Sequence, residues 1–197
     1  MNLLFWQTIF ITSLIIASVV ASKVIMVFDF FILPAAVIAY AFTFLATDII
    51  NEKYGKEEAK KMVQFGFIAL IFATILIYIA GLLPVAPFAP ERQEAFEIIL
   101  GHNWRIVLAS LTAYYIAQMV DINVFNWLKQ KFNFKYKWLR NNVSTWSGQA
   151  IDTCIFITIA FYGIVPELGI MILSQYLFKI ALAAIDTPLF YLFTRKK

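Results

Sequence analysis

The chain has 197 residues, of which 62% are hydrophobic and only 14% are charged. Soluble domains carry about a quarter charged residues, and a chain of this length cannot bury so much apolar surface in one aqueous core. The composition therefore excludes an ordinary soluble domain and predicts a protein that uses lipid as its solvent. The net charge of +4 is small, so the positions of the charges are more informative than their sum.

The rarer residues exclude several other classes. Cys154 is the one cysteine, so an internal disulfide is impossible, and neither it nor the one histidine, His102, belongs to a metal-binding motif. Glycine motifs for phosphates or dinucleotides are absent. We therefore expect no cofactor and no metal. The N-terminal segment is apolar from Leu3 without a basic leader or a cleavage site, and we interpret it as a retained first span.

Six apolar stretches are long enough to cross a membrane, since about 20 mostly apolar residues span the hydrocarbon core. The predicted spans are residues 3–27, 30–50, 62–83, 106–128, 143–165 and 168–193. The alternation typical of barrel strands is absent, so we predict helices. The sequence thus predicts an all-α integral membrane protein with about six transmembrane helices, in a single domain over residues 1–197.

The polar connections predict how the spans are oriented. Residues 51–61, 129–142 and 195–197 hold 12 of the 16 basic residues. With an even number of spans these segments lie on one side with the N-terminus, and the positive-inside rule assigns that side to the cytoplasm. On the other side, acidic and apolar residues after Pro90 predict a short amphipathic helix at the outer interface. A simple connecting turn is the alternative.

Charged residues inside the spans are the strongest functional indication, because a charge at the bilayer centre costs about 2.5–3.5 kcal/mol. Asp152 and Lys179 each fall about 11 residues into their spans from opposite sides, which is roughly 16 Å of depth. We expect them to form an ion pair that fixes the helix register, to contact a solute, or to do both. The other charges in the spans are Lys23, Asp48, Asp121 and Asp186.

Polar side chains share helix faces with these charges. Gln149 lies three residues before Asp152, so both lie on one face of a helix. A carboxylate accepts two parallel N–H bonds, whereas an amide both donates and accepts. The pattern suits a flat heterocycle such as a purine, and it suits many other polar solutes too. Further polar residues of the same spans are Gln118, Ser144 and Gln175.

The order of these residues resembles a known family. The run from Ala46 to Lys56, ATDIINEKYGK, continues to Glu58-Ala59 and resembles the signature of the queuosine precursor transporter family. Later residues follow that family's motifs in order and spacing: Arg105, Ala109-Ser110, Asp121 and Phe125; then Arg140, Ser144-Thr145, Gln149, Asp152 and Phe156; then Gln175, Lys179, Thr187-Pro188 and Tyr191. The first span fits more loosely. The resemblance covers nearly the whole chain.

The resemblance implies a multi-pass carrier in the plasma (inner) membrane of a prokaryote. It would import 7-deazaguanine precursors used to modify tRNA, such as preQ0, preQ1 or queuine. These bases present two N–H donors beside a carbonyl group. We therefore expect Asp152 and Gln149 to bind that edge, with Lys179 as the charge partner of Asp152.

Other residues complete the predicted site. Asp121 or Asp186 would receive the aminomethyl cation of preQ1, and an aromatic side chain, from Phe156, Trp146 or Tyr176, would stack on the ring. The residues predicted to bind substrate are Asp152, Gln149, Lys179, Asp121, Gln118, Gln175, Ser144 and Phe156. Those predicted to have structural or gating roles are Asp48, Glu52, Arg105, Arg140, Lys23 and Asp186.

Two other functions stay open. Substrate-binding subunits of energy-coupling-factor vitamin importers also have about six helices, and an alanine stripe on their first helix docks the partner chain, as Ala17 and Ala21 could. An intramembrane enzyme is the weaker alternative, because no catalytic arrangement is present. The expected partners are a nucleobase and the lipid bilayer, without direct nucleic acid; a homodimer is allowed but not required. Proton coupling and facilitated diffusion are both compatible with the sequence.

Overall fold

A computed structural model of the chain describes residues 2–21, 23–27, 31–101, 104–133, 135–163 and 167–194. Its elements are α1 Leu3–Val20, β1 Val24–Val27, β2 Phe31–Pro34, α2 Ala36–Tyr54, α3 Lys56–Leu82, α4 Glu91–Leu100, α5 Trp104–Lys131, α6 Lys137–Phe161 and α7 Leu168–Thr194. Several predictions fall outside the described parts: the side chains of Arg105 and Asp186, the loop residue His102, the span ends at Phe30 and Val165, and the basic tail 195–197.

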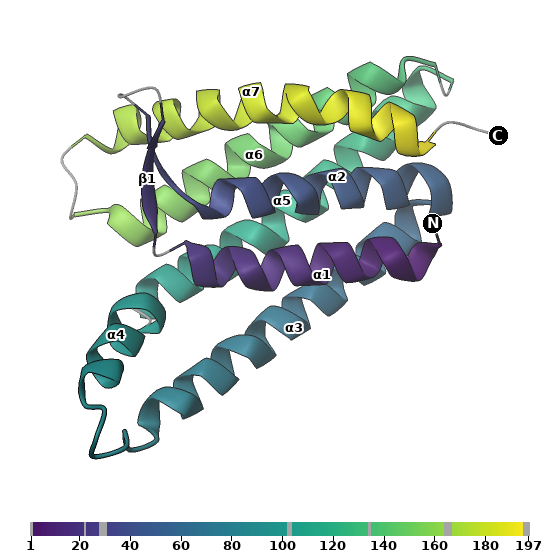
Figure 1. Ribbon diagram of the computed structural model, residues 1–197. Helices are drawn as coiled ribbons and strands as arrows, with labels where there is room; N and C mark the ends of the chain where they lie inside the picture. The colour runs from purple at the N-terminus through teal and green to yellow at the C-terminus, as the bar shows by residue number, and fades with distance from the viewer. Residues whose placement is uncertain are drawn as a thin grey trace.

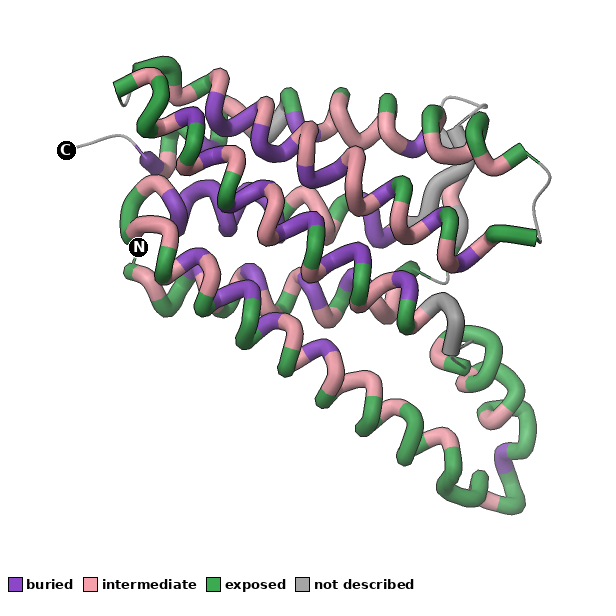
Figure 2. Tube along the Cα trace, turned by 180° about the vertical axis from the view of Figure 1, so that it is seen from behind, coloured by how far each residue is buried: buried purple, intermediate pink, exposed green. Residues whose placement is uncertain are grey.

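The long helices form a bundle in which α2 is central. It packs against α1, α3, α5 and α7, while α6 packs against α5 and α7. The start of α1 and the end of α7 lie at the same end of the bundle, and α3 leaves the bundle obliquely and carries α4 at its far end (Figure 1). Burial is concentrated along the packed helices, whereas the far part of α3 is mostly exposed (Figure 2).

The surface of the bundle has the character expected of a membrane protein. Four helices, α1, α3, α7 and the segment Val107–Lys131 of α5, are long and apolar enough to cross a membrane. Only 11% of the apolar window of α3 and 12% of that of α7 are buried inside the protein, so their side chains face outward. The chain is an all-α membrane protein, as predicted. The remaining long helices, α2 and α6, are more polar because they bury the polar interior described below.

The first two helices are shorter than the predicted spans. α1 ends at Val20, and Lys23 follows it as an exposed residue and not as part of a span. β1 and β2 then pair antiparallel, and the Ala35 amide donates to the Lys23 carbonyl at 2.8 Å. This segment is rich in β-branched residues, which favour extended structure, and Pro34 has no N–H to donate into a helix. The hairpin therefore replaces the helical ends expected on both sides of it.

The short helix predicted after Pro90 is present: α4 lies between α3 and α5, and none of its residues is buried. Pro188 lies inside α7, which continues through it to Thr194. Next to Pro188, a hydrogen bond connects α7 to α6: the Asn142 amide donates to the Thr187 hydroxyl at 2.8 Å.

The close approach of α5 and α6 generates a first prediction. A Cβ atom added at Gly148 would lie 3.1 Å from the Ala117 carbonyl oxygen and 3.1 Å from the Phe44 ring. We expect Gly148→Leu to lower the free energy of unfolding by about 1–3 kcal/mol, the usual cost of overpacking, in a thermal melt in detergent. Gly169→Leu is the matched control, because nothing lies within 4 Å of a Cβ added there. Equal melting temperatures for the two variants would contradict this packing.

Candidate functional site

A row of buried polar side chains runs along the interior faces of α2 and α6. On each helix every one of these residues has another of them three or four positions away, so they share one face. On α2 they are Thr43, Thr47, Asp48 and Asn51; on α6 they are Arg140, Asn141, Ser144, Thr145, Gln149 and Thr153. Neither lipid nor an apolar core can solvate such groups. The polar face of each helix is therefore held inside the bundle.

A small pocket opens on this row between α2, α6 and α7. Its lining residues are Val37, Tyr40, Ala41 and Phe44 of α2, Thr145 and Gln149 of α6, and Lys179, Leu182 and Ala183 of α7. It has room for about one water molecule, whereas pockets that hold small organic ligands measure about 300–1,000 Å³. The pocket is therefore closed to a nucleobase in this conformation.

The predicted ion pair between α6 and α7 lies at this pocket. Lys179 Nζ donates to Asp152 Oδ2 at 2.7 Å and to the Thr153 hydroxyl at 3.1 Å. Each charged side chain is 14% exposed, and Tyr40 of α2 lines the same pocket as Lys179. Pairing removes most of the cost of burying both charges. It also leaves the pair beside the space that a solute would occupy.

Gln149 offers an unused hydrogen-bonding group in the same place. Its side chain is 5% exposed and lines the pocket, and its Oε1 has no hydrogen-bond partner among the described residues. A buried acceptor left without a donor costs about 1–3 kcal/mol. The Gln149 amide is therefore suited to accept a bond from a ligand that enters the pocket.

A second polar level lies between α2, α5 and α6. Asp48 and Asp121 are 1% and 0% exposed, and the Asp121 carboxyl faces the Asp48 carboxyl and the Ser144 hydroxyl. The Thr145 hydroxyl donates to Asp48 Oδ2 at 3.3 Å. Beside them, the Thr47 hydroxyl donates to Gln118 Oε1 at 3.1 Å. Of the residues predicted to bind substrate, Gln118, Asp121 and Ser144 thus lie at this level and not in the pocket lining.

The aromatic residues of the pocket differ from those expected. Phe156 lies farther along α6, where its ring packs against Phe161 with centroids 6.1 Å apart, and it is not in the lining. Tyr40 and Phe44 supply the aromatic surface instead. Tyr40, Phe44 and Asp48 are spaced by four residues, so all three lie on one face of α2. This spacing could have predicted from the sequence that both rings lie on the same helix face as Asp48. Gln175 is buried one turn before Lys179.

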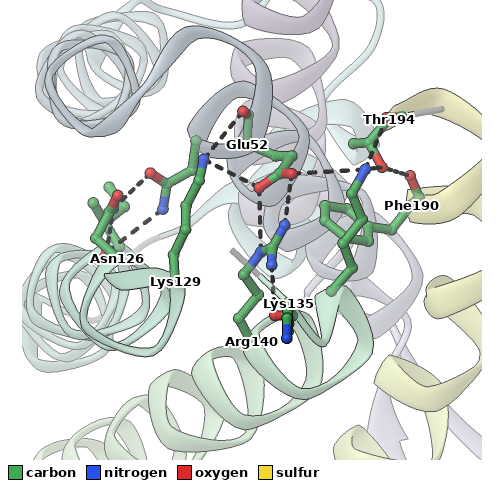
Figure 3. Close-up of polar contacts among 10 residues, drawn as sticks. Glu52, Asn126, Lys129, Lys135, Arg140, Phe190 and Thr194 are labelled. Atoms are coloured by element: carbon green, nitrogen blue, oxygen red, sulfur yellow. Dashed lines mark hydrogen bonds and ion pairs between the residues drawn. The ribbon is translucent and has the colours of Figure 1, made fainter. Parts of the chain in front are cut away.

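At the end of the bundle where α1 starts and α7 ends, Glu52 is surrounded by three cations (Figure 3). Arg140 Nη2 lies 2.6 Å from Glu52 Oε1, and Arg140 Nε donates to Oε2 at 3.2 Å. Lys129 Nζ is 3.1 Å from Oε2 and Lys137 Nζ is 3.6 Å from Oε1. Lys137 also donates to the Thr194 carbonyl at 3.0 Å. This cluster ties α2, α5, α6 and α7 together.

Glu52 and Arg140 were predicted to be structural or gating residues, whereas the contributions of Lys129 and Lys137 were not predicted. All four lie in the basic segments assigned to one side of the membrane, which was the available signal. Burial raises the pKa of Glu52, but the hydrogen bond and charge of Arg140, with Lys129, outweigh it and hold that pKa below its ordinary value of 4.5. Glu52 is therefore ionised at neutral pH.

Comparison with known proteins identifies the family. The family model described as "Putative vitamin uptake transporter" matches residues 34–193. The chain is 39% identical to a "Probable queuosine precursor transporter" of Bacillus subtilis, over 81% of this chain and 70% of that protein. The chain belongs to this transporter family. The family that the sequence motifs resemble is thereby confirmed, and membership indicates a multi-pass transporter and not an enzyme.

More distant relatives agree with this assignment. A "Probable queuosine precursor transporter" of Haemophilus influenzae is 33% identical over 64% of this chain. The "Queuosine precursor transporter" of Escherichia coli is 32% identical over 63% of this chain. The aligned regions span 50% and 53% of these two proteins. No solved structure gave a significant match.

The cluster around Glu52 generates a second prediction. Glu52→Gln would leave Arg140, which is 2% exposed, without its counter-charge, so we expect the free energy of unfolding to fall by about 3–5 kcal/mol. Glu57→Gln is the matched control, because the Glu57 side chain is 76% exposed and its replacement is expected to change stability by no more than about 0.5 kcal/mol. Thermal unfolding in detergent measures both.

Comparison of the wild type with Glu52→Gln also gives a prediction of how stability depends on pH. Since the folded-state pKa of Glu52 is lowered, its stabilising effect is complete above the ordinary value of 4.5 and is lost as the pH falls through the lowered value. The difference in melting temperature between wild type and Glu52→Gln should stay constant near neutral pH and shrink only in acid. A difference that already shrinks between pH 8 and pH 6 would show that another group is responsible.

The ion pair at the pocket gives a third prediction. Asp152→Ala or Lys179→Ala alone strands a buried charge, at a cost of about 3–5 kcal/mol. The double variant removes both charges and should cost less than the sum of the single variants, with a coupling energy of at least about 1 kcal/mol. A thermodynamic cycle of the four proteins measures this energy, and additive losses would mean that the pair is not formed in the membrane protein.

Proposed function

We propose that this chain imports queuosine precursors of the 7-deazaguanine class, for tRNA modification, across the plasma (inner) membrane of a prokaryote. Two kinds of support exist. The relatives carry the name queuosine precursor transporter, and one observation supports the site directly. Gln149 Oε1, which has no hydrogen-bond partner among the described residues, lies in a pocket with Lys179, beside the Asp152–Lys179 pair.

The chemistry of these groups matches the edge of a guanine-like base. Two adjacent N–H groups of the base can donate to the two oxygens of the Asp152 carboxylate. The Gln149 amide accepts from a further N–H or, turned over, donates to the base carbonyl. Tyr40 and Phe44 provide the aromatic surface on which the ring stacks. In this arrangement Lys179 shares Asp152 with the base or moves aside while keeping its bond to Thr153.

Entry of the base requires a conformational change. The closed pocket is lined by α2, α6 and α7, so these helices must separate to admit a ring. Carriers commonly bind their solute near the membrane midplane and open to each side in turn. The Glu52 cluster joins the same helices at the end of the bundle that we assign to the cytoplasm. It is suited to hold that end closed while the pocket opens to the other side.

The structure disfavours the alternative of a vitamin-importer subunit. That alternative requires an alanine stripe on the first helix that a partner chain can reach. Ala17 is 0% exposed and packs in the core with Trp6, Phe10 and Leu14, whereas Ala21 is exposed. A partner therefore cannot dock on both alanines, and we propose a carrier that works as a single kind of chain.

Uptake by cells tests this proposal and gives the fourth prediction. Cells that neither make nor import these precursors should accumulate labelled preQ0 or preQ1 when they express this chain. We expect Gln149→Leu to reduce the initial rate about tenfold, the value of one buried hydrogen bond, and Asp152→Asn to abolish uptake. Gln64→Leu, on the exposed face of α3, is the matched control and should transport normally.

The variants must be compared at equal abundance in the membrane, measured by immunoblot. Normal uptake by Asp152→Asn would remove this residue from the site. A wild-type chain that inserts correctly but accumulates neither base would overturn the proposed substrate class.

A further inference from the structure

We propose that Asp48 and Asp121 form a proton-binding site, separate from the solute pocket, that couples solute import to the proton gradient. This inference rests on the proposed carrier function and goes beyond it, because it names the driving force. The two residues come from α2 and α5, and neither lines the pocket between α2, α6 and α7.

The first argument is the burial of two facing carboxyl groups. Asp48 is 1% exposed and Asp121 is 0% exposed, and each carboxyl faces the other. Two carboxylates that share one buried site cannot both be ionised at low cost, so one proton is retained between them. Neither carboxylate oxygen of Asp121 has a hydrogen-bond partner among the described residues. The Asp121 carboxyl is therefore able to take up a proton or another hydrogen-bond donor.

The second argument is that the other carboxylates near this pair, Glu52 and Asp152, already have counter-charges. Toward one end, Glu52 is paired with Arg140, Lys129 and Lys137. Toward the pocket, Asp152 is paired with Lys179. Among the described side chains, no lysine or arginine forms an ion pair with Asp121.

The third argument concerns the kind of cation. Sodium sites in carriers use carbonyl oxygens released where a helix is unwound. Here α2, α5 and α6 run unbroken past the pair, as Ala36–Tyr54, Trp104–Lys131 and Lys137–Phe161, so their carbonyl oxygens are engaged in helical hydrogen bonds. The described residues hold no group of three or more acidic, histidine or cysteine side chains for a metal ion. A proton needs only the carboxyl oxygens themselves.

The fourth argument is a direct connection between the pair and the pocket. Thr145 lines the pocket, and its hydroxyl donates to Asp48 Oδ2 at 3.3 Å. Phe44 also lines the pocket, and a Cβ at Gly148 would lie 3.1 Å from its ring and 3.2 Å from Asp121 Cβ. Movement of the pocket walls around a solute therefore changes the contacts of both carboxyl groups. A proton bound from the outer side would be released on the cytoplasmic side after the solute enters.

The test uses the purified chain in liposomes with the membrane potential clamped at zero and labelled preQ0, which is uncharged. If one proton accompanies each solute, an interior that is one pH unit more alkaline should give up to about tenfold accumulation, since one pH unit is worth about 1.4 kcal/mol per proton. A protonophore should abolish the accumulation. In Asp121→Asn, and separately in Asp48→Asn, the ratio of uptake with and without the gradient should fall to about one.

Two further arms separate this inference from the carrier function. Glu57→Gln, which removes an exposed carboxylate on α3, should keep the wild-type response to the gradient. Exchange of labelled for unlabelled preQ0 across the membrane requires a carrier but no gradient. If the wild-type chain exchanges preQ0 but its net uptake ignores the pH gradient, or follows a sodium gradient, the proton site would be overturned and the carrier function would be left intact. Absence of exchange would overturn both.

Discussion

A charge buried in this protein needs a counter-charge inside the protein, because neither lipid nor an apolar core solvates it. This constraint determines how the helices are arranged. Glu52 meets it with three cations from α5 and α6, and Asp152 meets it with Lys179 of α7. The Glu52 cluster joins α2 to α5 and α6, which are distant in the sequence, and the Asp152–Lys179 pair joins the consecutive helices α6 and α7. We propose that these ion pairs help to fix the register of the bundle. The Asp48 and Asp121 carboxyl groups are also buried in its interior.

The same constraint explains where the pocket lies. α2 and α6 carry polar faces that lipid cannot solvate, so they are turned toward the interior of the bundle. The apolar helices α3 and α7 are left to present their side chains outward, which is why so little of them is buried inside the protein. A pocket lined by α2, α6 and α7 is consequently the place where polar groups, aromatic rings and an outward-facing helix meet.

Much of this arrangement could be predicted from the sequence, because helix geometry is regular. Equal depths of Asp152 and Lys179 follow from a constant rise per residue, and these residues do pair. The rotation of a helix about its axis depends on packing, so the sequence did not separate Gln118 and Asp121 from the pocket or select Tyr40 and Phe44 over Phe156. The hairpin after Val20 was missed because its residues are as apolar as a span, and apolar content alone does not distinguish a strand from the end of a helix.

The most direct test of the central claim is an experimental structure of the protein with preQ0 bound. The account predicts the base between α2, α6 and α7, with its hydrogen-bonding edge on Asp152 and Gln149 and its ring against Tyr40 or Phe44. The Asp152–Lys179 contact is then either shared with the base or broken. A base bound outside this pocket, with the Asp152–Lys179 pair unchanged, would contradict the account.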